Sequence, residues 1–571
     1  MKTTVYNDLY TPEGECAVGG QWDVYPRPQL VRDSFFSLNG AWNFTAGEGK
    51  WETITVPYPP ESLLSGIHRH MGKCPRLTYR KTFTLPEGFV RDRVLLHLGA
   101  VDQIASVTLN SAHLGDHRGG YAPFSFDITD YLADTNTLVV EVTDNLADKV
   151  LPYGKQCEKR GGMWYTPVSG IWQTVWIESV PMEYVHSLHV DTAADHAVIR
   201  AEGVDCGTIT VTTPDGEISV SLEQGVARVD LTSPRMWSPE DPYLYEFTLQ
   251  TESDRVRSYF ALRTLDIREV NGISRLCLNG TPYFFHGVLD QGYYSDGIFT
   301  PASPKCYDND ILAMKNLGFN MLRKHIKVEP EYFYYACDRL GMIVFQDMVN
   351  NGDYSFFRDT ALPTVGLKSL PDGLLHRDPA TREAFIQGME ETVAQLREHP
   401  CICCWTIFNE GWGQFAGTAM YHHLKELDST RFIDTASGWF RPSVSDVVSE
   451  HVYFKPIKLQ PAEKPIFLSE FGGYVYRVDG HVFNPDKTYG YRIFDDRQKF
   501  ENALIALYEN EVIPHIKTGL CATVYTQLSD VEDETNGLLT YDRKVCKIDT
   551  SRMREIAEKI KKGLLPYGGC P

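Results

Sequence analysis

The sequence predicts a three-part protein in which two β-rich parts precede a larger parallel α/β part. At 571 residues the chain is too long for one ordinary domain. At roughly 150 residues per domain, we expect about four domains, or three if one of them is a large barrel. Short alternating apolar runs, split by Gly, Pro and Asn turns, fill the chain up to about residue 267. From residue 268 onward, strand-like apolar runs alternate with amphipathic helical periods.

Residues 1–182 are predicted to form a jelly roll, and residues 183–267 a small immunoglobulin-like sandwich. In the first part, short alternating runs such as 94–98 and 138–142 recur between turn residues, which is typical of a sandwich or jelly roll. In the second part, the runs 208–211 and 218–222 flank a Pro-Asp-Gly turn at 214–216. Its length of about 85 residues suits one sandwich of this kind.

Residues 268–571 are predicted to form a (β/α)8 barrel, the TIM-barrel fold. Eight apolar runs are interpreted as strands, at 284–288, 319–323, 342–346, 402–408, 432–435, 447–451, 466–469 and 522–527. Amphipathic segments lie between most of them, for example at 308–317, 330–340, 381–398, 416–427 and 500–516. The periodicity alone indicates a parallel α/β arrangement, and the count of eight strands over about 300 residues is guided in part by a family resemblance carried by other motifs.

The composition is that of a globular protein, and it disfavours nucleic acids and membranes as partners. Hydrophobic residues make up 43% and charged residues 23% of the chain. The longest apolar stretches run to about eight or nine residues, far short of the roughly 20 that a membrane helix needs. The charge sum is 55 minus 75, or −20, and such a field repels a phosphate backbone.

The cysteines and the N-terminal residues favour a cytoplasmic location. The 13 cysteines are an odd count, and residues 1–8 show no apolar core of the kind that a secretory signal carries. Free thiols in a reducing compartment fit best. Cys401, Cys403 and Cys404 look at first like metal ligands, but they lie in one continuous apolar run with no Cys or His cluster nearby. A buried strand is the better interpretation, so neither a metal site nor a cofactor is expected.

Two glutamates lie at the carboxyl ends of predicted strands, where catalytic groups of a barrel are found. Glu410 follows one strand in the run TIFNEGWG, and Glu470 ends another in the run IFLSEFGG. A carboxylate at the mouth of a buried apolar strand is costly unless it is paired or used. Two facing carboxylates, one protonated and one ionised, are the minimum for glycoside hydrolysis. The alternative is that both cap helix N-termini, which is common in α/β folds.

Further motifs, spread over essentially the whole chain, give the sequence a resemblance to glycoside hydrolase family 2. In the first part they are SLNGAW at 37–42, VTLN at 107–110, LGDHRGGYAPF at 114–124 and WYTPVSGIWQTVW at 164–176. In the second part, WSPEDPYLY at 237–245 resembles the signature of the family's immunoglobulin-like domain. The family comprises β-galactosidases, β-glucuronidases and β-mannosidases, so the resemblance implies a glycosidase.

The resemblance also implies a retaining mechanism and assigns roles at the two strand ends. The family's acid/base glutamate follows an asparagine at the end of barrel strand 4, which Asn409 and Glu410 match, and its nucleophile lies in a Ser-Glu-aromatic-Gly pattern, which Glu470 matches. Glu470 would form a covalent glycosyl-enzyme. Glu410 would protonate the leaving group and then deprotonate water, with the carboxyl groups about 5–5.5 Å apart. Asn409 is expected to bind the sugar 2-hydroxyl, or alternatively to cap a helix.

Other strand ends supply candidate substrate-binding residues. Arg323 and His325 end strand 2, where the family places an arginine near the nucleophile, and an arginine there would keep Glu470 ionised. Tyr453 falls where the family often has a tyrosine that touches the nucleophile. Each of these residues could instead be structural, as an ion pair or a core aromatic. The remaining candidates are strand-end polar residues and aromatics that could contact a sugar: Asp290, Gln291, Asp347, Trp412, Trp439 and Tyr525.

The sequence indicates the reaction more clearly than the identity of the sugar. We find no asparagine-any-lysine motif after Glu470, with which the family's glucuronidases hold the substrate carboxylate, although Lys324 or Lys327 could take its place. Residues 346–348 lean towards a mannosidase-like pattern. The acidic run 526–537 either contacts sugar hydroxyls or is a solvated loop.

We therefore expect a retaining exo-β-glycosidase, with galactose as the sugar by base rate. The alternatives are a β-glucuronidase, a β-mannosidase, and a carbohydrate-binding homologue without turnover. A scaffold role is disfavoured because both strand-end motifs are intact. A small glycoside is the expected partner, and the resemblance also allows a homo-oligomer formed through the β parts.

Overall fold

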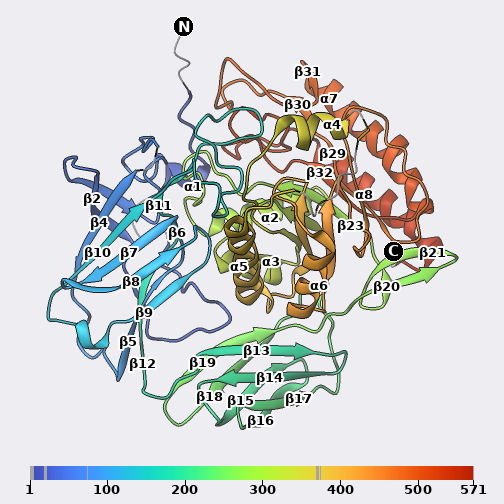
Figure 1. Cartoon of the computed structure of the whole chain (residues 1–571). Helices are drawn as coiled ribbons and strands as arrows, with labels where there is room; N and C mark the ends of the chain where they lie inside the picture. Colours follow the sequence, from blue (N-terminus) through green and yellow to red (C-terminus); the bar gives the residue numbers. More distant parts are fainter. Residues whose placement is uncertain are drawn as a thin grey trace.

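The computed structural model describes residues 6–17, 22–73, 75–364, 366–367, 372 and 375–569, and it contains the three predicted parts (Figure 1). In this view the first part lies to the left of the barrel and the second lies below it. The predicted division after residue 182 falls between strands. The division after residue 267 falls inside a strand, Leu265–Val270, so we propose to place that boundary a few residues earlier, after Phe260.

The described strands of the first part form three sheets. One has the order β3-β2-β4-β10-β7-β8, one has the order β1-β12-β5-β9, and β6 pairs with β11. In β10 every second side chain from Asn136 to Val142 is buried, because successive residues of a strand point to opposite faces. A short helix, α1 (Pro12–Glu15), precedes the strands β1 (Phe36–Ser37), β2 (Gly40–Ala46), β3 (Glu52–Val56), β4 (Arg76–Phe83), β5 (Arg93–Leu98), β6 (Val101–Asp102), β7 (Ile104–Leu109), β8 (Ala112–Arg118), β9 (Phe124–Asp127), β10 (Asn136–Thr143), β11 (Gly170–Ile171) and β12 (Val175–Val180).

The second part is an antiparallel β unit with the strand order β13-β14-β17-β16-β15-β18-β19. β16 and β17 share only the residue pair Glu223–Val226, so the strands separate there into two groups around one apolar core. The predicted hairpin at the Pro-Asp-Gly turn is confirmed, since β15 and β16 pair along their length. The strands are β13 (Ser187–Thr192), β14 (His196–Glu202), β15 (Cys206–Thr213), β16 (Gly216–Glu223), β17 (Val226–Asp230), β18 (Tyr245–Gln250) and β19 (Arg255–Phe260).

Among the described residues, the sheet of the third part has eight parallel strands, in the order β27-β26-β25-β24-β23-β32-β29-β28. All eight predicted runs are strands. Every residue of β26 is buried, including Cys403 and Cys404, and Cys401, directly before this strand, is buried as well. A small sheet of β20 (Leu265–Val270), β21 (Ile273–Leu278) and β22 (Thr281–Pro282) leads into β23 (Phe285–Asp290), β24 (Met321–Lys324), β25 (Ile343–Asp347), β26 (Ile402–Asn409), β27 (Phe432–Ser437), β28 (Val448–Val452), β29 (Ile466–Gly472) and β32 (Leu520–Thr526).

Helices cover the outside of the barrel (Figure 1). Helices α2, α3, α5 and α6 lie close to predicted amphipathic segments. The segment 500–516 is split, with α7 followed by a π-helical turn (Tyr508–Val512) and a 3₁₀ turn (Ile513–Thr518), and α4 and α8 match none of the predicted segments. The helices are α2 (Lys305–Asn316), α3 (Glu331–Leu340), α4 (Leu362–Thr364), α5 (Pro379–Leu396), α6 (Gly417–Leu427), α7 (Arg497–Leu507) and α8 (Thr550–Leu564), and a short parallel pair, β30 (Tyr474–Tyr476) and β31 (Arg492–Phe494), follows β29. Within the described residues, no helix has both the length and the apolar character needed to span a bilayer.

Side chains bridge the two end strands of the barrel sheet, β27 and β28. The Ser437 hydroxyl lies 2.9 Å from Nε2 of His451, and the Ser449 hydroxyl donates to Oδ2 of Asp434 at 2.6 Å. The side chains of Ser437, Ser449 and Asp434 are buried. The position of His451 is thereby tied to the closure of the barrel.

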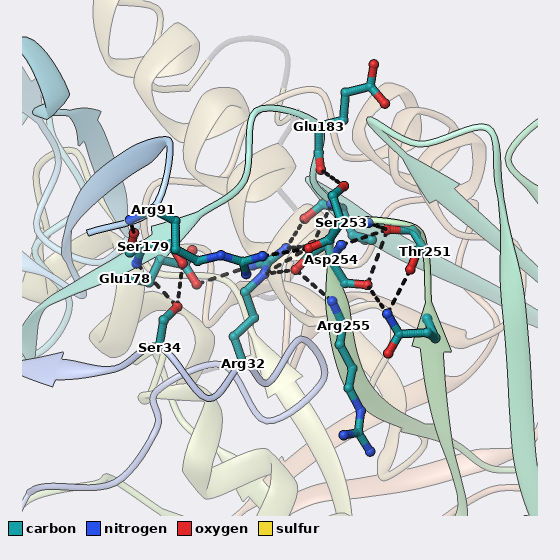
Figure 2. Close-up of polar contacts among 12 residues, drawn as sticks. Arg32, Ser34, Arg91, Glu178, Ser179, Glu183, Thr251, Ser253, Asp254 and Arg255 are labelled. Atoms are coloured by element: carbon teal, nitrogen blue, oxygen red, sulfur yellow. Dashed lines mark hydrogen bonds and ion pairs between the residues drawn. The ribbon is translucent and has the colours of Figure 1, made fainter. Parts of the chain in front are cut away.

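A buried ion-pair network joins the first two parts (Figure 2). Arg32 lies between two carboxylates, with Nη1 at 3.2 Å from Oε2 of Glu178 and Nη2 at 2.8 Å from Oδ2 of Asp254. All three side chains are almost fully buried. Because Glu178 belongs to β12 and Asp254 lies just before β19, this guanidinium links the two β units.

The long connection between β10 and β11 runs from the first part to the barrel (Figure 1). The backbone carbonyl of Asn350, just beyond β25, accepts hydrogen bonds from the amides of Tyr153 and Gly154 at 3.1 and 3.2 Å. The Tyr153 hydroxyl donates to the carbonyl of Gly352 at 2.8 Å. The connection therefore lies against the loop at the carboxyl end of β25.

Candidate active site

Two carboxylates meet at the carboxyl end of the barrel, as the sequence predicts. Glu410 directly follows β26, and Glu470 lies in β29. Their nearest side-chain oxygens are within 4.8 Å of each other, and a ring nitrogen of His451 lies within the same distance of both. The Glu410 side chain is 17% exposed and that of Glu470 is 7% exposed. The pair is thus largely shielded from water, and Glu410 is the more exposed of the two.

Irregular backbone orients both glutamates. Glu410 has a φ of +54°, a left-handed conformation that residues with a side chain seldom adopt and that concentrates at functional sites. In β29 the pairing with β32 changes register between Leu468 and Phe471, and such an irregularity turns a side chain out of the regular alternation. Apolar periodicity locates the strands, but it does not reveal these deviations.

Three neighbouring side chains keep Glu470 ionised. Nη1 of Arg323 donates to Oε1 at 3.0 Å, the Tyr453 hydroxyl donates to Oε2 at 2.5 Å, and Nδ1 of His451 lies 3.7 Å from Oε2. Burial raises the pKa of this carboxyl group, but the charges of His451 and Arg323 outweigh burial and lower the pKa to about 2. Glu470 is therefore an anion at neutral pH, which a carboxylate nucleophile requires.

The imidazole of His451 links the two carboxylates, and sequence reasoning did not single it out. Nδ1 lies 2.8 Å from Oε1 of Glu410, on the side away from the Ser437 contact. A signal was available, because His451 ends the predicted strand 447–451, two residues before Tyr453. What the sequence lacked was the geometry that brings this strand end between two others.

Arg323 gathers four of the predicted residues around itself. The guanidinium is fully buried; Nε donates to Oδ1 of Asp347 at 3.0 Å, and Nη2 donates to Oδ1 of Asn409 at 2.8 Å. Oδ2 of Asp347 lies 2.7 Å from Nδ1 of His325. The carboxylate of Asp347 therefore positions Arg323 and His325, and the contact of Asn409 with a sugar stays a prediction.

Three other predicted residues lie near these strand ends with partners of their own. The Trp439 indole donates to the backbone carbonyl of Glu410 at 2.9 Å. Tyr525 is fully buried, and its ring meets that of Phe471 edge-on at 5.8 Å. Asp290, at the end of β23, accepts a hydrogen bond from Nζ of Lys324 at 2.6 Å. Direct contact of Trp439, Tyr525 and Asp290 with a sugar stays a prediction.

Lys324 and Lys327 are not free to hold a substrate carboxylate, which corrects one alternative drawn from the sequence. Both side chains are 1% exposed. Besides Asp290, Lys324 binds Oε1 of Glu329 at 2.9 Å, and Lys327 binds the same oxygen at 2.9 Å together with two backbone carbonyls. Their positive charge is already used inside the protein.

The acidic run after β32 is not a solvated loop. Glu532, Asp533 and Glu534 are 3%, 5% and 3% exposed. Arg160, from the connection between β10 and β11, lies 3.1 Å from Oε2 of Glu532 and 3.2 Å from Oδ1 of Asp533. The first part of the chain thus supplies the partners of these carboxylates.

A TIM barrel with paired, strand-end carboxylates, joined to a jelly roll and a sandwich, has the architecture of a multidomain glycosidase. Residues 269–545 match the TIM barrel domain of the glycosyl hydrolases family 2. Residues 70–161 match the family's galactose-binding domain-like unit, and residues 186–263 match a third domain of the same family. The chain belongs to glycosyl hydrolase family 2.

Curated relatives are β-galactosidases and β-glucuronidases at low identity. The β-galactosidase of Thermoanaerobacter pseudethanolicus is 23% identical over 508 residues, which cover 79% of this chain and 63% of that protein. The β-galactosidase of Aeromonas hydrophila is 26% identical, over 77% of this chain and 45% of that protein. The β-glucuronidase of Homo sapiens is 24% identical, over 73% and 70%. The chain thus spans less than two thirds of the length of these two β-galactosidases.

Solved structures share the fold. The β-D-glucuronidase from Dictyoglomus thermophilum has a TM-score of 0.73 at 19% identity and covers 94% of this chain and 98% of its own. A β-galacturonidase from Eisenbergiella tayi bound to galacturonate has a TM-score of 0.66 at 17% identity and covers 95% and 99%. At these identities the likeness is one of fold.

Proposed function

We propose that the protein is a retaining exo-β-glycosidase that removes a terminal sugar, galactose in our primary proposal, with Glu470 as nucleophile and Glu410 as acid/base. The observation that carries the proposal is the approach of the two carboxylates to within 4.8 Å. A short separation of about 5–5.5 Å between carboxyl groups is the retaining geometry, whereas inverting enzymes leave about 6.5–9.5 Å for a water molecule.

In the first step, an oxygen of Glu470 attacks the anomeric carbon as the bond from that carbon to the glycosidic oxygen breaks. Glu410 donates its proton to the leaving oxygen, and the sugar stays attached to Glu470 as an ester. Arg323 and Tyr453 hold the attacking carboxylate in place, with contacts of 3.0 and 2.5 Å.

In the second step, Glu410 takes a proton from water, and the water oxygen attacks the anomeric carbon. The ester bond to Glu470 breaks, and the carboxylate returns to its contacts with Arg323, Tyr453 and His451. His451 touches both glutamates, so it is placed to follow the charge as this charge passes from one carboxylate to the other.

The test compares initial rates on nitrophenyl β-galactoside, β-glucuronide, β-mannoside and β-glucoside for the wild type, Glu470→Gln and Glu410→Gln. We expect one preferred sugar, and we expect each substitution to lower kcat/KM by about a thousandfold or more, because the nucleophile or the proton donor is lost. A 2-fluoro sugar should label Glu470 covalently, which mass spectrometry of peptides detects.

Two results would contradict the proposal. Wild-type turnover that survives in Glu470→Gln would remove Glu470 as the nucleophile. Sugar binding without turnover on every glycoside, and without labelling by the fluoro sugar, would identify a carbohydrate-binding homologue. Preference for the glucuronide or the mannoside would replace galactose and keep the mechanism.

A further inference from the structure

The connection between β10 and β11 carries one lysine, Lys155, whose two neighbours in sequence are firmly fixed. Gly154 has a φ of +63°, and a Cβ atom there would lie 2.8 Å from the carbonyl oxygen of Ile326, just beyond β24. On the other side, Nε2 of Gln156 donates to Oδ2 of the buried Asp102 at 2.7 Å. The backbone at Lys155 is thus held against the barrel from one side and against the first part from the other.

Unlike its neighbours in this segment, the ammonium group of Lys155 has no hydrogen-bond or ion-pair partner among the described residues. The residue is 9% exposed, and Nζ lies 5.8 Å from the centre of the Trp164 ring. Within the described residues, no acceptor lies within hydrogen-bonding distance of this nitrogen and no carboxylate pairs with it. Arg160 and Arg323, by contrast, both have carboxylate partners. An ammonium group has three hydrogens to donate, so Lys155 is available to bind a ligand.

Ring contacts connect Lys155 with the residues next to the catalytic carboxylates. The ring of Trp164 meets that of Trp412 edge-on at 5.1 Å, and Trp412 bridges back to Asn409, the residue before Glu410. Burial lowers the pKa of His325, and the charge of Lys155 lowers it further. Because Gly154 lies against Ile326 and Trp164 contacts both Lys155 and Trp412, Lys155 lies near the end of β24 and near the loop that follows Glu410.

Glu534 is linked to the Lys155 segment through Tyr165. Burial raises its pKa, the charge of Lys155 opposes that rise, and the charge of Glu470 adds to it. The Tyr165 hydroxyl donates to Oε2 of Glu534, Nδ2 of Asn536 donates to Oε1 at 3.1 Å, and the amide of Tyr165 donates to the carbonyl of Lys155 at 3.0 Å. Lys155 and Glu534 are thus fixed through a common neighbour, yet they do not form an ion pair.

We propose that Lys155 and Glu534 together bind one hydroxyl group of the glycone in the site of the proposed glycosidase. Nζ of Lys155 donates to the hydroxyl oxygen, and the hydroxyl hydrogen is donated to the carboxylate of Glu534. This inference rests on the proposed function and narrows it to neutral sugars. A uronic acid could accept from Lys155, but its carboxylate would then face that of Glu534, so the pair selects against it.

The test measures kcat and KM of Lys155→Met and Glu534→Gln on the preferred nitrophenyl glycoside, on its singly deoxygenated analogues and on the matching uronide. Lys159→Met is the matched control, because Lys159 lies exposed on the same connection. We expect each site variant to lower kcat/KM about 10- to 100-fold on the full sugar, as for loss of a hydrogen bond to a charged group. One deoxy analogue should be insensitive to both substitutions, and Lys159→Met should match the wild type.

Two outcomes would overturn the inference. One is a Lys155→Met rate within twofold of the wild type on every neutral glycoside. Another is a wild type that prefers the uronide and loses that preference in Lys155→Met, since Lys155 would then bind a carboxylate. Lys155→Arg and a thermal unfolding curve for each variant separate loss of binding from loss of fold.

Failure of the proposed function itself gives a different result. If the wild type hydrolyses nothing, calorimetric titration with free galactose and free galacturonic acid still tests the pair. Weaker galactose binding in Lys155→Met and Glu534→Gln than in the wild type supports the inference, and equal binding overturns it.

Discussion

At the residue scale, the centre of the site is the carboxyl group of Glu470. After burial, which raises the pKa of this group, His451 has the largest effect and lowers the pKa. The resulting pKa of about 2 lies below the ordinary value of 4.5. Ionised Glu470 therefore stabilises the fold above pH 4.5, and this contribution is lost as the pH falls towards 2.

We expect His451→Gln to raise the pKa of Glu470 and to move the acid limb of the kcat/KM profile to higher pH. His422→Gln, at an exposed position of α6, is the control, and an unmoved acid limb in His451→Gln would contradict this account.

The residues of the site differ in how far the sequence could predict them. Glu410 and Glu470 are recognisable because each ends an apolar strand in a distinctive run. His451 and Lys155 are not, because their importance comes from neighbours that are distant in sequence. The distance from Lys155 to its electrostatic neighbours His325 and Glu534 exceeds 150 positions in the chain, and no periodicity carries such information.

At the element scale, the segment that carries Lys155 depends on one glycine. Gly154→Ala would retain a left-handed backbone and would also push a Cβ atom towards the carbonyl of Ile326, 2.8 Å away. We expect a loss of stability of about 1 kcal/mol or more and a KM several-fold above that of the wild type, because the segment has to move away from the barrel. Calorimetric unfolding and steady-state kinetics measure the two effects.

Gly480→Ala is the matched control, because Gly480 has a similar φ of +82°, and a Cβ atom there would have no atom of the described residues within 4 Å. Gly480→Ala should lower the stability, because alanine is strained at this positive φ, but it should leave KM unchanged. Equal KM values in the two variants would mean that the close approach of Gly154 to the barrel does not position the site.

The elements themselves were largely predictable, and their irregularities were not. Apolar runs, together with the family resemblance, located all eight barrel strands. Seven of these strands are buried at every residue and need no alternation, and β28 alone has residues of intermediate burial. The register change in β29 and the π-helical turn after α7 have no such signal, since both depend on packing against neighbouring elements.

At the scale of the whole molecule, Arg32 is the residue on which the joint between the two β units depends (Figure 2). Arg32→Met would leave the buried carboxylates of Glu178 and Asp254 without this partner. Removal of one member of a buried ion network typically costs about 3–5 kcal/mol, and we expect a loss of that order in denaturant unfolding. Arg91→Met is the control, because exposed Arg91 crosses the same joint with one hydrogen bond to Ser253, at 2.7 Å. A similar small loss in both variants would contradict this role.

The buried acidic loop after β32 also bears on how the chain is made. Three consecutive carboxylates repel one another unless cations and hydroxyl donors surround them, and here Arg160 and Tyr165 come from the part of the chain that is translated first. Domains generally fold as units during synthesis, N-terminal ones first. Arg160 and Tyr165, which contact the last loop of the barrel, are thus synthesised about 370 residues before that loop. In this protein, the order of the parts along the chain is also a workable order of assembly.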